Sequence, residues 1–204
     1  MNIIKVILAI GMSILLSAGL VAPVNAAIWY NPETQKFENT DSLNKRPEEV
    51  ATGIRGGSPV KKQIIDYETT EKAGTIIVNT AERRLYLVME DGKALRYGIG
   101  VGREGFTWAG TNRITRKAEW PGWTPPPAMR KRVPDLPAFM PGGPDNPLGA
   151  RALYIGSTLY RVHGTSEPWT IGQAVSSGCI RMTNEDVTDL YERVQVGARI
   201  VVKH

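Results

Sequence analysis

Residues 85–99 read LYLVMEDGKALRYGI, and this stretch decides the fold class of the 204-residue chain. Two runs of aliphatic and aromatic residues flank Asp91-Gly92, a dipeptide that favours the tight turn of a β-hairpin. Another β-rich run precedes them at residues 75–80. Short strands at this spacing favour an antiparallel sandwich or barrel over alternating strands and helices. Further short strands are predicted over residues 113–119, 152–155 and 159–162.

One helix stands out near the end of the chain. Residues 183–186, TNED, resemble a capping box, in which a threonine side chain satisfies a free amide group at the start of a helix. Gly197 is expected to end this helix, and residues 198–202 are expected to form a closing strand. Apolar residues recur between them at the spacing of an amphipathic helix: Val187, Leu190, Tyr191 and Val194.

A segment rich in proline and tryptophan separates the predicted strands. Nine of the 14 prolines fall between Pro121 and Pro147. Proline neither pairs in a central strand nor continues a helix, so we predict a loop. Trp120, Trp123 and Met129 give this loop apolar surface. A loop of this length inside a compact domain is commonly a lid or a binding wall, and the alternative is a loop that only shields a sheet edge.

Residues 1–26 have the pattern of an export signal. A short start containing Lys5 is followed by an apolar run over residues 6–22, and small residues precede a cleavage point before Ala27. The alternative is a retained membrane anchor, because the apolar run is almost long enough to span a bilayer. In both cases the rest of the protein works outside the cytoplasm, which predicts a periplasmic or cell-envelope location with no stable membrane span after cleavage.

Composition divides the remainder of the chain into two parts. Residues 27–72 are polar and show no sustained periodicity, so we predict an N-terminal extension or linker before a folded domain at 73–204. Lys and Arg number 25 against 20 Asp and Glu, which gives a formal net charge of +5. This modest excess favours anionic partners. The chain carries no nucleic-acid-binding motif, and nucleic acid is set aside as a partner.

A single cysteine and two histidines limit the chemistry. One cysteine excludes a disulfide within the chain, and one cysteine with two histidines is too few for a four-ligand Cys/His zinc site. We expect neither a metal nor another cofactor. Cys179 is therefore either buried and inert or exposed and reactive.

The residues around Cys179 favour a reactive thiol. A thiol becomes a good nucleophile when a nearby imidazole accepts its proton. His204 is the last residue, so His163 is the imidazole expected in the folded domain. Gly178 permits a sharp turn in which backbone amides of Gly178 and Cys179 face a developing oxyanion. Spacing alone leaves two interpretations open: a catalytic Cys–His pair, or a core cysteine and an unrelated structural histidine.

Four motifs, taken together, resemble one family. HGT at 163–165 and SSGCIRM at 176–182 resemble the L,D-transpeptidase catalytic domain of the YkuD-like cysteine transpeptidases of bacterial cell walls. WPGWTPPP at 120–127 is similar to the family's Trp-Thr-Pro-Pro stretch, and NPLGARALY at 146–154 leads into the strand before the histidine. The resemblance implies that residues 73–204 are the catalytic domain, a mainly β sandwich or barrel with one or two short helices and a long Pro/Trp-rich active-site loop.

The resemblance also implies a role for each residue of the site. Cys179 is the nucleophile that becomes acylated, and His163 is its base. The backbone carbonyl of Gly164 orients the imidazole, and Ser176 takes a supporting hydrogen-bonding position. Backbone amides of Gly178 and Cys179 form the oxyanion hole.

Substrate contacts are expected mainly from arginines. Arg181 is either a carboxylate partner or a brace for the site, since a guanidinium serves both purposes equally well. The family commonly has histidine immediately before the Gly-Cys pair, whereas this chain has Ser177, a departure that concerns substrate detail rather than the reaction class. Arg151 is a further candidate for the substrate's carboxylates. The candidate substrate-binding residues are Arg181, Arg161, Trp123 and Ser177.

The substrate implied by the resemblance is the peptidoglycan stem peptide. The thiolate attacks the diaminoacid–D-Ala bond of a tetrapeptide stem, releases D-Ala and transfers the acyl group to an amine. A stem-peptide amine gives a 3→3 cross-link, and an amine of an envelope protein anchors that protein to the wall. Two alternatives stay open: an L,D-carboxypeptidase or hydrolase of the same fold, and a non-catalytic peptidoglycan-binding module.

Overall fold

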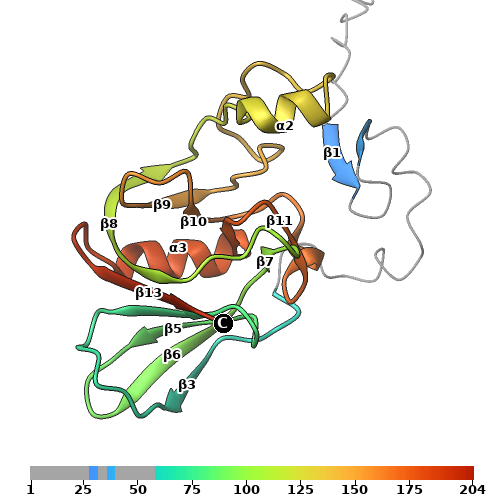
Figure 1. Ribbon diagram of the computed structural model, residues 1–204. Coiled ribbons are helices and arrows are strands. Elements are labelled where there is room, and N and C mark those ends of the chain that lie inside the picture. Colours follow the sequence, from blue (N-terminus) through green and yellow to red (C-terminus); the bar gives the residue numbers. More distant parts are fainter. Residues whose placement is uncertain (1–27, 32–35, 40–57) are drawn as a thin grey trace, which may run out of the picture.

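The computed structural model describes residues 28–31, 36–39 and 58–204 (Figure 1). The predicted export signal, residues 1–26, lies outside the described residues. Within the described part, no helix has the length and apolar character needed to cross a bilayer.

Strands account for most of the regular structure in the described residues. The helices are α2 (Pro127–Arg132), the short 3-10 helix η2 (Pro168–Thr170) and α3 (Asn184–Arg193). The strands of the first half are β1 (Ile28–Asn31), β2 (Lys36–Asn39), β3 (Gln63–Asp66), β4 (Ile76–Asn79), β5 (Arg84–Val88), β6 (Lys93–Gly98) and β7 (Val101–Gly102). Those of the second half are β8 (Gly110–Glu119), β9 (Arg151–Ile155), β10 (Arg161–His163), β11 (Ala174–Ser176), β12 (Ile180–Arg181) and β13 (Arg199–Lys203).

One large mixed sheet forms the body of the molecule. Its nine strands run in the order β12-β10-β9-β8-β13-β4-β5-β6-β3, while β1 pairs with β2 and β11 pairs with β7. Most neighbours are antiparallel, but β13 runs parallel to β4 and β10 runs parallel to β12. In Figure 1, β8, β9 and β10 lie on one side of α3 and β13, β5 and β6 lie on the other. The predicted mainly β, sandwich-like fold is confirmed.

The core lies between the two halves of the sheet. Alternate residues of each strand point inward, and α3 adds its apolar face, as its predicted spacing requires. The largest fully buried side chains come from both halves and from the helix: Tyr97, Ile76, Leu85, Ile114, Leu153, Ile155, Met182, Leu190 and Ile200. This shared core fixes β10 and β12 relative to each other, and both strands carry residues of the site.

The predicted hairpin at Asp91-Gly92 is confirmed. Both residues have positive φ, 56° and 65°, as the tight turn between β5 and β6 requires. The weak strand signal at residues 113–119 belongs to β8, which begins earlier and bulges between Ile114 and Arg116. The two- and three-residue strands β7, β11 and β12 are absent from the prediction because so few residues carry no local pattern.

The prediction that the proline-rich segment contains no helix is wrong. The chain forms α2 immediately after Pro126, with Pro127 in the first turn. A helix leaves the amide groups of its first turn without internal partners, so the missing proline N–H costs nothing there.

The end of the predicted N-terminal extension joins the sheet. Residues 63–66 form β3, the edge strand that pairs with β6. Val60 packs on Gly98, where a Cβ on the glycine would lie 2.6 Å from the valine Cβ. Lys62 reaches α3 and forms a 3.6 Å ion pair with Asp189.

Both ends of α3 are capped. The Thr183 hydroxyl oxygen accepts a hydrogen bond of 3.1 Å from the backbone N–H of Asp186, as the predicted capping box requires. At the other end, the Lys117 ammonium donates to the backbone carbonyls of Tyr191 and Val194. A cation at this end favours the helix, because the last carbonyls carry partial negative charge.

We predict that Thr183→Ala lowers the free energy of unfolding by about 1 kcal/mol, because the Asp186 amide loses its acceptor. Urea denaturation followed by circular dichroism measures the change. Thr188→Ala is the matched control: the Thr188 hydroxyl donates to a backbone carbonyl within the same helix, so its loss is expected to change stability by less than about 0.5 kcal/mol. Equal effects of the two substitutions would contradict the capping role.

Candidate active site

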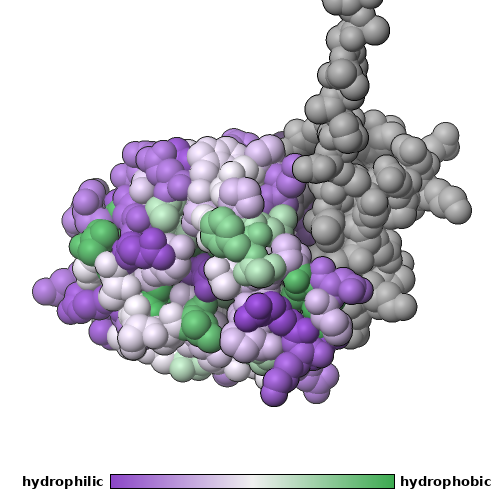
Figure 2. Space-filling model, turned by 90° about the horizontal axis from the view of Figure 1, so that it is seen from above, coloured by the Kyte–Doolittle hydropathy of each residue, from purple (hydrophilic) through white to green (hydrophobic). Residues whose placement is uncertain are grey.

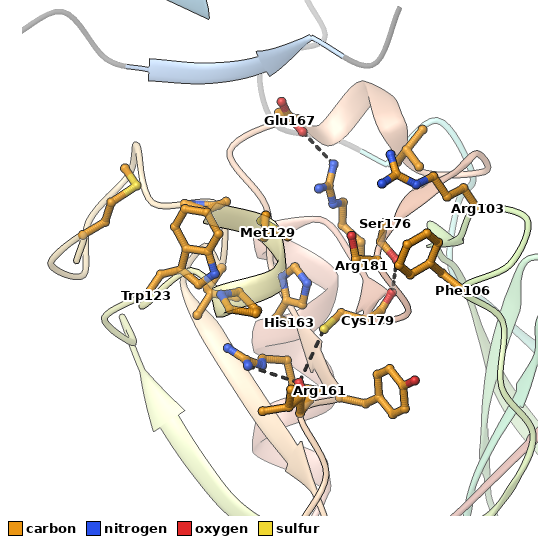
Figure 3. A pocket seen from close by; sticks show the side chains of 18 of the residues that line it. Arg103, Phe106, Trp123, Met129, Arg161, His163, Glu167, Ser176, Cys179 and Arg181 are labelled. Atoms are coloured by element: carbon orange, nitrogen blue, oxygen red, sulfur yellow. Dashed lines mark hydrogen bonds and ion pairs between the residues drawn. The ribbon is translucent and has the colours of Figure 1, made fainter. Parts of the chain in front are cut away.

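A pocket of about 570 Å³ lies between the proline-rich segment and the strands that carry the motifs. Side chains from the proline-rich segment and from the motif-bearing strands line it, and Figure 3 shows them pointing into the same pocket. Seven of the nine candidate site residues from the sequence line it: Cys179, His163, Ser176, Ser177, Arg161, Arg181 and Trp123.

His163 ends β10 and is buried, with 4% of its surface exposed. Its Nδ1 lies 2.6 Å from the carbonyl oxygen of Gly164. A carbonyl only accepts hydrogen bonds, so Nδ1 carries the proton and Nε2 keeps its lone pair. Burial lowers the pKa of His163 to about 3, and the positive charge of Arg181 acts in the same direction. The imidazole is therefore neutral and able to accept a proton at Nε2.

Cys179 precedes β12, and its half-buried side chain lines the same pocket as the imidazole (Figure 3). The Sγ atom lies 3.8 Å from the carbonyl oxygen of Leu159, and no hydrogen bond between described residues joins it to His163. Burial raises the pKa of the thiol, while the nearby charge of Arg161 opposes that effect. The resting site therefore holds a neutral thiol and a neutral imidazole.

Ser176 closes the turn that carries the cysteine. Its hydroxyl donates to the carbonyl of Cys179 at 2.6 Å and accepts from the Gly178 amide at 3.2 Å. The Gly178 N–H, one of the two amides expected at the oxyanion hole, is thus engaged within the turn. The Cys179 N–H has no hydrogen-bond partner among the described residues.

Trp108 holds this turn from outside. Its indole N–H donates to the carbonyl of Gly178 at 2.9 Å, and its ring stacks on Tyr160 at 4.8 Å with an interplanar angle of 6°. In a trans peptide the C=O and N–H groups point in opposite directions. The indole therefore directs the Cys179 N–H away from Trp108. Sequence reasoning missed this residue, because a lone tryptophan 70 positions from its partner carries no local signal.

Arg181 points to a buried acid. Its Nη1 forms a 2.6 Å ion pair with Glu167 and lies 3.0 Å from the hydroxyl oxygen of Thr170. Of the two roles left open for Arg181, these contacts favour the brace, since the carboxylate it meets belongs to the protein. Glu167 is the second residue that the sequence did not reveal.

The proline-rich segment forms a wall of the pocket and has a small core of its own. Trp123, Leu136 and Leu148 are buried in it, packed against Met129, Val133 and Met140. Trp123 and Met140 also exchange two backbone hydrogen bonds of 2.8 Å. Figure 2, which looks down on the face nearest α2, shows hydrophobic residues set among hydrophilic ones. The segment lines the pocket and therefore does more than cover a sheet edge.

Two further residues from the sequence line the pocket. Ser177 is separated from Cys179 by Gly178 alone. Arg161 donates to the carbonyl of Leu159 at 3.1 Å and lies close enough to lower the thiol pKa. Among the described residues, no three His, Cys, Asp or Glu side chains are grouped as a metal site would need.

Comparison with known proteins gives a consistent result. The model of the YkuD family, the L,D-transpeptidase catalytic domain, matches residues 73–202. The Escherichia coli K12 protein named probable L,D-transpeptidase ErfK/SrfK is 43% identical over 152 residues, which cover 70% of this chain and 47% of that protein. Probable L,D-transpeptidase YbiS of the same strain is 40% identical over 150 residues, covering 69% and 47%.

A solved structure shares the fold. The crystal structure of a protein named probable carnitine operon oxidoreductase CaiA, from Brucella melitensis, is 44% identical, with a TM-score of 0.50, and the match covers 72% of this chain and 96% of that one. Its name differs from those of the sequence relatives. The chain spans about half the length of the curated relatives it matches. From the family model and these identities, this chain belongs to the L,D-transpeptidase catalytic domain family.

Proposed function

We propose that the protein is an exported peptidoglycan L,D-transpeptidase that uses Cys179 as its nucleophile. The observation that carries the proposal is the placement of the chain's one thiol in the same pocket as an imidazole whose Nδ1 is fixed by Gly164. The family supplies the substrate class, the stem peptide, and the local geometry supplies the chemistry. The expected export signal supports a location in the periplasm or cell envelope.

The first step is acylation of the cysteine. Because thiol and imidazole are both neutral at rest, His163 acts as a general base during the attack rather than as half of a preformed ion pair. Nε2 takes the thiol proton while Sγ bonds to the carbonyl carbon of the diaminoacid–D-Ala bond. The C–N bond then breaks, and the imidazolium returns the proton to the departing amine of D-Ala. A thioester remains on Cys179.

Backbone N–H groups stabilise the oxyanion in this proposal. The carbonyl oxygen becomes negative when sulfur adds, and a fixed N–H close to it lowers the energy of that state. The Cys179 N–H fits this role because its peptide group is held by Trp108 and because no described residue accepts from it. The Gly178 N–H contributes only if it leaves Ser176.

The second step decides the product. An acceptor amine attacks the thioester carbonyl, and His163 takes a proton from that amine. The C–S bond then breaks, and the imidazolium returns the proton to the sulfur, which regenerates the thiol. A stem-peptide amine yields a 3→3 cross-link, and an amine of an envelope protein yields an anchored protein. Water yields carboxypeptidation, the alternative of the same fold. The apolar wall around Trp123 and Met140 favours transfer, because it keeps water from part of the pocket.

We predict that a tetrapeptide ending in D-Ala leaves a D-Ala-less adduct on the full-length protein, detected by intact-mass spectrometry. Cys179→Ala is expected to give no adduct. His163→Gln is expected to slow its formation at least about 100-fold, because the base is lost. His204→Gln is the matched control, since His204 contacts Thr80 and does not line the pocket. A wild-type protein that never acquires the adduct would favour the non-catalytic binding module.

We predict that the thiol behaves as a neutral group. Because burial raises its pKa, the thiolate is a minor species at pH 7 and its fraction grows as the pH rises. Alkylation by iodoacetamide, followed by mass spectrometry, is expected to be slower than for free cysteine at pH 7 and to accelerate beyond pH 9. A rate that is flat from pH 5 upward would instead reveal a thiolate–imidazolium pair.

We predict that Trp108→Phe keeps the ring stack on Tyr160 and loses the hydrogen bond to Gly178. The rate of acylation by the tetrapeptide is expected to fall about tenfold, through kcat rather than KM, because the oxyanion amide is less well fixed. Alkylation by iodoacetamide forms no oxyanion and is expected to be unchanged. Equal losses in both reactions would mean that Trp108 only supports the fold around the cysteine.

A further inference from the structure

Two arginines flank one tyrosine on the face of the sheet that carries His163. The register places Arg116 of β8 opposite Tyr154 of β9, and Tyr154 opposite Arg161 of β10. The guanidinium carbons lie 3.6 Å (Arg116) and 5.5 Å (Arg161) from the centre of the tyrosine ring. We call these three residues the cationic row.

The cationic row meets the catalytic pocket at Arg161. Side chains two positions apart share a face of a strand, so the neighbouring row on this face is Ala118, Ala152 and His163. Ala152 is fully buried, so of these two rows the pocket is lined by His163 and Arg161. Arg161 belongs to both features, because it also lines the pocket.

Both arginines of the row lack an acid partner among the described residues. Arg151 and Arg181 form ion pairs with Glu119 and Glu167, but no described acid pairs with Arg116 or Arg161. Stacking on an aromatic face orients a guanidinium and leaves the N–H groups at its edge available. Two parallel N–H groups at the edge of a guanidinium pair best with the two oxygens of a carboxylate.

We propose that the cationic row is a carboxylate subsite for the acyl donor, and this rests on the proposed function. A stem peptide carries free carboxylates near the carbonyl that reacts. Arg161 lies beside Sγ, so a group bound there belongs to the substrate whose carbonyl is at the sulfur. The donor stays attached through both steps, whereas D-Ala and the acceptor each occupy the site for one step. Arg161 meets the carboxylate nearer the thioester, and Arg116 meets one farther along the donor.

The test compares two synthetic tetrapeptides ending in D-Ala, one with free carboxylates along its length and one with those groups amidated. The D-Ala terminus is the same in both. The KM for D-Ala release by the wild type is expected to be about tenfold lower for the free-carboxylate peptide. Arg116→Gln is expected to raise that KM about fivefold with little change in kcat, and to leave the KM of the amidated peptide unchanged. Arg116→Lys is expected to recover part of the difference.

Arg113→Gln is the matched control. Arg113 lies on the same strand, but its guanidinium donates to the carbonyl of Gly197 instead of joining the row. The KM values for this variant are expected to match the wild type. The subsite is overturned if the wild type treats the two peptides alike, or if Arg116→Gln raises both KM values equally. Release of D-Ala from neither peptide would overturn the proposed function itself, and the subsite with it.

Discussion

The site depends on one peptide group, the one between Gly178 and Cys179. Residue 178 has φ of +102°, a conformation that favours glycine, and a Cβ there would lie 2.5 Å from a ring carbon of Tyr160. Only without a side chain can the backbone approach the Trp108–Tyr160 stack closely enough for the indole to bind the carbonyl. That contact sets the orientation of the Cys179 N–H and the position of the backbone that carries the thiol.

A second constraint is the burial of His163 and Cys179. Desolvation lowers the pKa of His163 and raises that of Cys179, so each group is uncharged by itself. The charge of Arg181 adds to the effect on the imidazole, even though Glu167 balances that charge locally. An imidazolium becomes favourable only when negative charge develops nearby, as it does when the thiol attacks a carbonyl. A thiol that stays protonated until then is also less open to oxidation.

The sequence predicts those features of the fold and the site that are determined by residues close together in the chain. The Asp91-Gly92 turn and the Thr183 cap act over a few residues, and both were predicted with correct positions. Cys179 and His163 were predicted because the chain offers so few alternatives of either type. Trp108 was missed, because its partner lies 70 positions away and only the folded chain brings them together.

The same reasoning explains the other misses. Glu167 acts through a buried contact with Arg181, and an acid in a loop gives no sign of such a partner. Strands as short as β7 and β12 exist because the surrounding sheet holds them in register, not because their two residues favour extended structure. The helix α2 follows from where its prolines fall rather than from how many there are, since Pro127 is tolerated in the first turn and would be disruptive one turn later.

Net charge is a poor guide to what the arginines of this site do. Arg181 and Arg151 resemble Arg161 in the sequence as candidate carboxylate partners, yet ion pairs with Glu167 and Glu119 already engage them. Each ion pair offsets part of the arginine's attraction for a bound anion, although Arg181 still lowers the pKa of His163. The guanidinium groups over Tyr154 lie against an aromatic ring that carries no net charge, and Arg161, one of the two, lines the pocket. Only the folded structure therefore separates the arginines that have an acid partner from those that have none among the described residues.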